Sequence, residues 1–318
     1  MAIFVMMKKL LILMLATVAL QGCVAGNMMC RRILAPERDP QALAKSREFA
    51  VNTYPYIKEW LDSMETNGVL RDTSIVTSDG LVKHAFYAEA PARSSRTAII
   101  VHGYFSTPYK MMMLGNFYRE QMGWNILIPH MEYHGLSEGQ DIQMGWFDRI
   151  DVKEWADVAH RRFSDTLQVI HGISMGGATV MMLSGDDDLP PYIRGMVEDC
   201  GYTSVWDEFK YQAKQMFHIP AWPVLYSMEK VCRRKYGWDF HEASSVEQLR
   251  HSTLPMLFIH GDADDFVPAE MARTNFDAKT QGYKELWMAE GSPHAMSWRD
   301  HPKEYASKVK EFISGHVL

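Results

Sequence analysis

The chain has 318 residues, of which 47% are hydrophobic, 12% aromatic and 23% charged, which is the composition of a globular protein with a sizeable core. Its formal net charge of −6 is distributed without long runs of one sign, a pattern that argues against nucleic acid as a partner. The length allows one large domain or two small ones, and α/β folds of this size are often single.

Residues 1–22 have the pattern of an export signal. Lys8 and Lys9 precede an apolar run from Leu10 to Leu20, which is too short to span a bilayer comfortably, since about 20 apolar residues are needed. The run and the following Cys23 resemble a bacterial lipoprotein signal. This resemblance implies cleavage before Cys23, acylation of its thiol and a membrane-anchored protein of the cell envelope. An ordinary secretory signal cleaved nearby and an uncleaved anchor helix are the alternatives.

Three further cysteines, Cys30, Cys200 and Cys232, follow the candidate lipid site. If Cys23 carries lipid, the odd number that remains cannot form a complete set of disulfides. A bond between Cys200 and Cys232 and a pair of buried free thiols are both compatible with the sequence.

Residues 23–72 form an N-terminal extension in which Ala42 to Leu61 has the best helical pattern. A hairpin is predicted next, because two β-rich segments, Thr73 to Thr77 and Leu81 to Ala88, flank the turn Ser78-Asp79-Gly80.

From Arg96 onward, short apolar segments alternate with helical patterns. The further predicted strands are Ala98 to Val101, Asn125 to Pro129, Leu167 to Ile173, Ile193 to Glu198, Met256 to Ile259 and Glu285 to Ala289. The predicted helices are Tyr109 to Met122, Val152 to Phe163, Met175 to Leu183 and Lys303 to Ile313. This alternation predicts a mostly parallel sheet of eight strands with helices on both faces and the hairpin at its edge.

About 55 residues separate the strand that ends near Cys200 from the strand at Met256, far more than a usual connection of about 2–6 residues plus one helix. We interpret this aromatic-rich interval as an insertion at about 203–250, in which Thr203 to Phe240 forms a helical cap over the carboxyl ends of the strands. The candidates for lining an apolar acyl pocket are Tyr202, Trp206 and Trp222. A helical excursion packed against the side of the sheet is the alternative.

The segment Gly172-Ile173-Ser174-Met175-Gly176 lies between a predicted strand and a predicted helix. A serine at such a tight turn adopts a strained backbone conformation that projects its hydroxyl from the sheet edge. Glycines two residues before and after it remove side chains that would collide where strand and helix approach. Ser174 is therefore the candidate nucleophile.

A serine hydroxyl needs a base to take its proton, and His294 is the candidate. It lies in a Gly/Pro-containing loop after the last predicted strand, where catalytic groups commonly lie. A carboxylate should orient the imidazole. Asp264 is preferred because the segment from His260 to Pro268 resembles a His-Gly-x-x-Asp-x-x-Val-Pro loop of known hydrolases. The other acids considered are Asp262, Asp265 and Asp199.

The tetrahedral intermediate of acyl transfer needs hydrogen-bond donors for its oxyanion. The backbone N–H of Met175, directly after the nucleophile, supplies one. The second is assigned to the backbone N–H of Tyr104, because His102-Gly103 after Val101 resembles a segment that places an amide there. For His102 itself we expect a structural role.

These motifs together resemble the α/β-hydrolase superfamily over residues 73–316, and more narrowly bacterial serine esterases and serine-aminopeptidase-like hydrolases with a helical cap. The set comprises His102-Gly103, the loop from His134 to Gly139, the Ser174 turn, the Asp264 loop and His294. The resemblance implies an α/β-hydrolase domain at 73–318 and acyl transfer to water through an acyl-serine, with no cofactor and no metal.

The leading functional hypothesis is a hydrolase of small-molecule carboxylic esters with small or medium acyl groups. A peptidase or amidase of the same fold is the alternative, in which cap acids such as Glu208 and Glu229 hold a substrate amine. A non-catalytic binding protein of the envelope is the third hypothesis. The sequence gives no indication of the oligomeric state.

Overall fold

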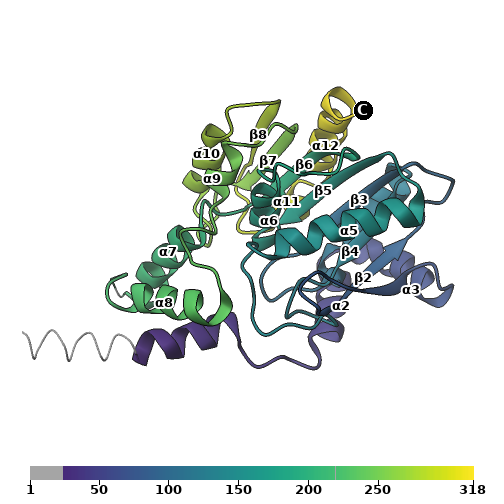
Figure 1. The fold of residues 1–318 in the computed structure, drawn as a ribbon. Helices are drawn as coiled ribbons and strands as arrows, with labels where there is room; N and C mark the ends of the chain where they lie inside the picture. Colours follow the sequence, from purple (N-terminus) through teal and green to yellow (C-terminus); the bar gives the residue numbers. More distant parts are fainter. Residues whose placement is uncertain (1–23, 219) are drawn as a thin grey trace, which may run out of the picture.

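The computed structural model describes residues 24–218 and 220–318. The predicted export signal and the candidate lipidation residue Cys23 lie outside these described residues. The chain folds around one twisted sheet with helices on both faces (Figure 1). Within the described ranges, no helix is long and apolar enough to cross a lipid bilayer.

The sheet has eight strands in the order β1-β2-β4-β3-β5-β6-β7-β8. The strands are β1 (Arg71–Val76), β2 (Val82–Ala88), β3 (Arg96–Val101), β4 (Asn125–Pro129), β5 (Leu167–Ile173), β6 (Ile193–Asp199), β7 (Met256–Gly261) and β8 (Lys284–Ala289). Strand β2 runs antiparallel to β1 and β4, and all other neighbours are parallel. This confirms the predicted fold class, an α/β-hydrolase sheet with an antiparallel hairpin at its edge.

Helices and helical turns connect the strands and cover the sheet. Before the sheet lie α2 (Ala42–Thr53), η1 (Pro55–Ile57) and α3 (Lys58–Thr66). Between β3 and β6 lie η2 (Pro108–Met111), α4 (Met112–Asn116), the π-helical turn η3 (Phe117–Gln121), α5 (Asp148–Phe163) and α6 (Met175–Leu183). After β6 lie α7 (Val205–Phe217), α8 (Val224–Tyr236), α9 (Ser245–Leu249), α10 (Ala269–Ala278), α11 (Ser297–Asp300) and α12 (Pro302–His316).

The centre of the sheet is apolar on both faces. Strands β4 and β7 are buried at every residue, and β5 at every residue but its first. Parallel strands covered on both faces need such continuous apolar runs. Two groups of buried side chains result, one on each face, and all of α6 is buried against the sheet.

The N-terminal extension packs into the same core. The predicted helix from Ala42 to Leu61 is interrupted at Tyr54, because a residue that precedes proline is disfavoured in helical conformation and Pro55 starts a new turn. The two helical pieces pack on one face of the sheet through Ala50, Tyr54 and Leu61, which are buried.

The insertion between β6 and β7 is helical, as the sequence predicts. Helix α7 contacts the loop after β7, where the Tyr211 hydroxyl and the Gln212 amide donate to the carbonyls of Asp265 and Phe266. Residues 24–34 are helical and pack against α8, at the lower left of Figure 1. At this crossing, a Cβ on Gly26 would lie 2.4 Å from the Cβ of Ser227.

Candidate active site

Ser174 lies at the sharp turn from β5 into α6, with φ 60° and ψ −121°, a conformation that only glycine adopts without strain. The close approach of strand and helix explains the two neighbouring glycines. A Cβ on Gly172 would lie 2.1 Å from the carbonyl oxygen of Gly176, and a Cβ on Gly176 would lie 2.2 Å from that of Val101. The turn therefore has the geometry predicted for a nucleophile.

The structure brings the three predicted side chains together. The Ser174 hydroxyl oxygen lies 2.8 Å from Nε2 of His294, and Nδ1 of His294 lies 2.7 Å from Oδ2 of Asp264. The serine follows β5, the aspartate follows β7 and the histidine follows β8, all at the carboxyl edge of the parallel strands. With Nδ1–H donating to the carboxylate, Nε2 is left to accept the serine proton.

Asp264 is held as an ionised acceptor. Its Oδ1 accepts the backbone N–H groups of Phe266 and Val267 at 2.9 Å each. Burial alone raises the pKa of this carboxyl, but hydrogen bonds from His260 and His294 outweigh it and lower the pKa to about 2. The carboxylate therefore stays charged at neutral pH and can stabilise an imidazolium.

The other acids that the sequence offered have different partners. Asp262 is exposed and accepts the backbone N–H of Gly291 at 2.6 Å, which fastens the loop that carries His294. Asp199 is buried and accepts the Tyr305 hydroxyl at 3.1 Å, and burial raises its pKa to about 6. Neither carboxylate is hydrogen-bonded to the His294 ring.

The loop after β3 lies against the serine. A Cβ on Gly103 would lie 3.0 Å from the Ser174 Cβ, and Tyr104 lines the cavity next to the serine. Among the described residues, no acceptor is hydrogen-bonded to the N–H groups of Tyr104 and Met175. Met175 is also the first residue of α6, so its amide belongs to the positive end of the helix dipole.

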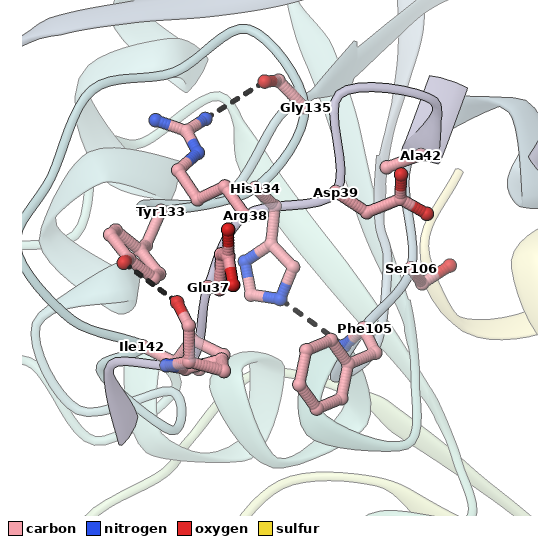
Figure 2. A pocket seen from close by; sticks show the side chains of 11 residues that line it. Glu37, Arg38, Asp39, Ala42, Phe105, Ser106, Tyr133, His134, Gly135 and Ile142 are labelled. Atoms are coloured by element: carbon pink, nitrogen blue, oxygen red, sulfur yellow. Dashed lines mark hydrogen bonds between the residues drawn. The ribbon is translucent and has the colours of Figure 1, made fainter. Parts of the chain in front are cut away.

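Two buried histidines fix this loop. His102 donates Nδ1–H to the Gly103 carbonyl at 2.9 Å and accepts the Met131 amide on Nε2 at 3.1 Å, which is the structural role predicted for it. His134 accepts the backbone N–H of Phe105 on Nε2 at 3.2 Å (Figure 2). Burial lowers the pKa of His134 to about 4, so the ring is neutral and can act as this acceptor.

A small cavity of about 90 Å³ lies beside His134 and shares Ser106 with the cavity at Ser174. Its other wall is the N-terminal segment, and Figure 2 shows Arg38 donating to the Gly135 carbonyl, a bond of 2.8 Å. The Tyr133 hydroxyl donates to the Pro36 carbonyl at 2.8 Å. The N-terminal segment is thus hydrogen-bonded to the loop that contains His134.

A cavity of about 310 Å³ opens onto Ser174 and His294. Its remaining lining residues are Phe49, Tyr54, Gly103, Tyr104, Ser106, Lys110, Met111, Met113, Ile173, Ala295 and Met296. Phe49 and Tyr54 come from the N-terminal extension, which sequence reasoning had not connected with the site. Met111 of η2 and Met113 of α4 also line it.

The three aromatic residues predicted for the pocket lie elsewhere. Tyr202 is buried in the core, where its hydroxyl donates to the Met144 carbonyl at 2.8 Å. Trp206 packs against Tyr226 of α8, and Trp222 is 55% exposed. Tyr202 precedes α7 and joins the core, and Trp206 of α7 contacts α8, so neither ring is left to line the cavity at Ser174.

The cysteines at 200 and 232 are free and buried, so no disulfide joins them. Cys200, Asp264 and His294 place potential metal ligands within 4.8 Å of one another. The aspartate and histidine atoms there already bond to each other, and burial raises the pKa of the Cys200 thiol well above its usual value, which disfavours the thiolate that a metal needs.

The sheet order and the serine turn define the α/β-hydrolase architecture, and the chain is a serine hydrolase. A model of the prolyl oligopeptidase family matches residues 138–317, more than half of the sequence, and the chain belongs to this family. The uncharacterized protein YqkD of Bacillus subtilis is 27% identical over 231 residues, which cover 71% of this chain and 74% of that protein.

Solved structures share the fold at low identity. An esterase of Pyrococcus furiosus, Pf2001, has a TM-score of 0.64 at 20% identity, with 80% of this chain and 96% of that chain covered. The acylaminoacyl peptidase of Pyrococcus horikoshii has a TM-score of 0.58 at 16% identity, with 78% of this chain and 41% of that chain covered.

Proposed function

We propose that the protein hydrolyses carboxylic esters of small or medium acyl groups, with Ser174 as nucleophile, His294 as general base and Asp264 as the orienting acid. The observation that carries the proposal is the cavity at Ser174. It joins a base-activated hydroxyl to a largely apolar wall, and no acidic side chain is among its described lining residues.

The geometry supports the usual two steps of acyl transfer. Ser174 attacks the ester carbonyl while Nε2 of His294 takes its proton, and the amides of Tyr104 and Met175 stabilise the oxyanion. His294 then returns the proton to the departing alkoxide, which leaves as the alcohol. Water, deprotonated by the same nitrogen, attacks the acyl-serine; the acid leaves as the proton passes from His294 to the Ser174 oxygen, which restores the hydroxyl.

Turnover of short p-nitrophenyl esters tests this function. Replacement of Ser174 by alanine should lower kcat by roughly 10⁴-fold or more, since the activated hydroxyl is lost. Ser95→Ala, which removes an exposed hydroxyl, serves as the matched control and should retain activity. Equal turnover in the Ser174→Ala variant would reject the assigned nucleophile.

Peptide or amide hydrolysis is the second candidate, favoured by the family and by the fold shared with an acylaminoacyl peptidase. The cap acids proposed to hold a substrate amine do not line the cavity. Glu208 is buried and accepts the Gln212 amide at 2.8 Å, while Glu229 pairs with His241. We therefore expect aminoacyl p-nitroanilides to be hydrolysed far more slowly than matched esters.

A non-catalytic binding role makes a separate prediction. A fluorophosphonate probe reacts with an activated serine, so the wild-type protein should be labelled and Ser174→Ala should not. Absence of labelling in both proteins would favour the binding role.

We further propose that the mature protein is a lipid-anchored protein of the cell envelope. The support is the sequence pattern of residues 1–22 followed by Cys23. Cys23→Ser should move the protein from the membrane fraction to the soluble fraction of a bacterial lysate. Unchanged fractionation would contradict acylation at this residue.

A further inference from the structure

Lys110 lines the same cavity as Ser174 and His294. It belongs to the short turn η2, directly after the loop that carries Gly103 and Tyr104. Apart from His294, it is the one ionisable nitrogen among the described lining residues, and no carboxylate accompanies it there. The cavity therefore presents a single positive charge on an otherwise uncharged wall.

The ammonium of Lys110 has no carboxylate partner within the described ranges of the chain. Its Nζ lies 4.8 Å from the centre of the Phe49 ring, a cation–π contact. Burial lowers the pKa of this lysine, as expected for an ammonium that has lost water without gaining an anion.

The carboxylate on the helix beside it is already engaged. Glu65 accepts from Arg47 at 2.7 Å and from the hydroxyl of Tyr109, the residue next to Lys110, at 2.8 Å. Glu65 is therefore not the counter-ion of Lys110. A half-buried ammonium that faces a cavity without its own counter-ion favours an anionic group of the ligand in that space.

We propose that Lys110 determines substrate specificity by binding a carboxylate carried by the ester, so that the preferred substrates are esters with a second, negatively charged end. This inference rests on the proposed esterase function and adds the substrate class. By the same electrostatics, substrates that carry an ammonium group are disfavoured, which agrees with the absence of acidic side chains among the lining residues that the structure describes.

A set of methyl esters of equal length tests the inference. Monomethyl adipate, methyl hexanoate and methyl δ-(trimethylammonio)valerate carry a negative, a neutral and a positive end at the same distance from the ester carbonyl. Acid release is followed by titration at constant pH. We expect the wild-type kcat/KM to be about tenfold higher for the anionic ester than for the neutral one, as one partly exposed charge-assisted hydrogen bond would give.

Lys110→Met removes the charge and leaves an unbranched side chain that is shorter by one heavy atom. The ratio of kcat/KM for the anionic and neutral esters should fall to near unity in this variant, and Lys110→Glu should favour the cationic ester. The matched control is Lys58→Met, which removes an exposed lysine paired with Asp62 and should leave the ratio unchanged. Because each ratio is measured within one protein preparation, altered folding of a variant does not mimic the effect.

A second pair places the charge on the alcohol side. The acetyl ester of δ-hydroxyvalerate is compared with pentyl acetate. The pair whose kcat/KM ratio changes more in Lys110→Met shows whether the lysine binds the acyl side or the alcohol side of the ester. Equal ratios for wild type and Lys110→Met in both pairs would overturn the inference while leaving ester hydrolysis intact. Absence of turnover for every ester, neutral ones included, would instead reject the proposed function.

Discussion

Nε2 of His260 lies 3.3 Å from Oδ2 of Asp264. The same oxygen accepts the Nδ1–H of the His294 ring at 2.7 Å, so it has nitrogen neighbours on two sides. Nε2 of His260 also lies 2.9 Å from the Val267 carbonyl oxygen, which identifies this nitrogen as the protonated one. His260 therefore positions the carboxylate without touching the serine.

His260→Phe should change how stability depends on pH. In the folded protein the pKa of Asp264 is about 2, below its ordinary value of 3.8. This ionisation therefore contributes stability that is present above about pH 4 and is lost as pH falls toward 2, about 2 kcal/mol in total. Without the His260 donor this contribution should shrink, so the variant should lose less stability than wild type on acidification.

Urea unfolding at about pH 5 and pH 3 measures the effect, because the pKa of His260 is raised and its ring stays protonated throughout this range. The unpaired Val267 carbonyl left by the substitution weakens the variant equally at both pH values, so the pH dependence isolates the carboxylate. His251→Phe, at an exposed position, is the control. An acid sensitivity equal to that of wild type would show that His260 does not act on Asp264.

Asp264→Asn should keep the site folded but disable it. The amide can still accept the two backbone N–H groups that bind Oδ1, yet its NH₂ would favour the wrong tautomer of His294. We expect kcat to fall by about 10³- to 10⁴-fold with little change in KM. Steady-state kinetics on a p-nitrophenyl ester measure this, with exposed Asp265→Asn as the control. A loss below about tenfold would mean that another group orients the histidine.

Alanine substitutions at Gly176 and Gly103, two glycines near Ser174, should have different effects: the first on stability and the second on activity. An alanine at Gly176 places its Cβ 2.2 Å from the Val101 carbonyl oxygen, a backbone atom, so we expect destabilisation of about 3 kcal/mol or more. An alanine at Gly103 meets the Ser174 Cβ at 3.0 Å, so the main loss should be in activity, about 100-fold, through displacement of the serine. Thermal unfolding measures the loss of stability, and kcat/KM measures the loss of activity. A larger loss of stability for Gly103→Ala than for Gly176→Ala would contradict these assignments.

The sequence predicted the local features of this fold well. Strands β4 and β5 and helix α6 have the predicted bounds, because a buried parallel strand and the helix behind a serine turn carry strong local patterns. The sequence also predicted that Ser174, Asp264 and His294 come together, because each lies in a loop with a distinctive motif.

The walls of the cavity could not be predicted in this way. Phe49 and Tyr54 lie about 120 residues before Ser174 in the chain, and no local pattern distinguishes an aromatic residue that faces a cavity from one in the core. The same ambiguity misplaced Tyr202, whose ring is buried in the core, and Trp206, whose ring packs against Tyr226. Long-range packing, not motif chemistry, decided which aromatic residues reach the site.

His134→Leu should weaken catalysis without touching the serine. It removes the acceptor of the Phe105 N–H and so loosens the loop that carries the Tyr104 amide. Loss of a whole oxyanion donor costs about 10²- to 10³-fold in kcat, so loosening one should cost roughly tenfold, with KM little changed. The control is His84→Leu on β2, where the ring pairs with Asp72 at the surface. If KM rises while kcat stays constant, the loop shapes substrate binding instead.

Asp148 should make the protein less stable as pH rises from about 4 to about 8. It is buried at the start of α5, where Oδ2 accepts the Gly145 N–H at 2.7 Å, while Oδ1 has no partner among the described residues. Burial, with a smaller contribution from the Asp151 carboxylate, raises its pKa to about 8. Between about pH 4 and pH 8 the folded state therefore holds a proton that the unfolded chain releases, so stability falls with rising pH, by up to about 1.4 kcal/mol per pH unit.

Asp148→Asn removes this ionisation while keeping an oxygen to accept the Gly145 N–H. Its urea midpoint should fall less than that of wild type between about pH 5 and pH 8, because the neutral amide gains no charge in the core. Asp187→Asn, at an exposed position, should follow the wild-type curve. Parallel curves for Asp148→Asn and wild type would show that Asp148 is ionised in the folded protein throughout this range and that a cation near it, such as the buried Lys83, compensates its charge.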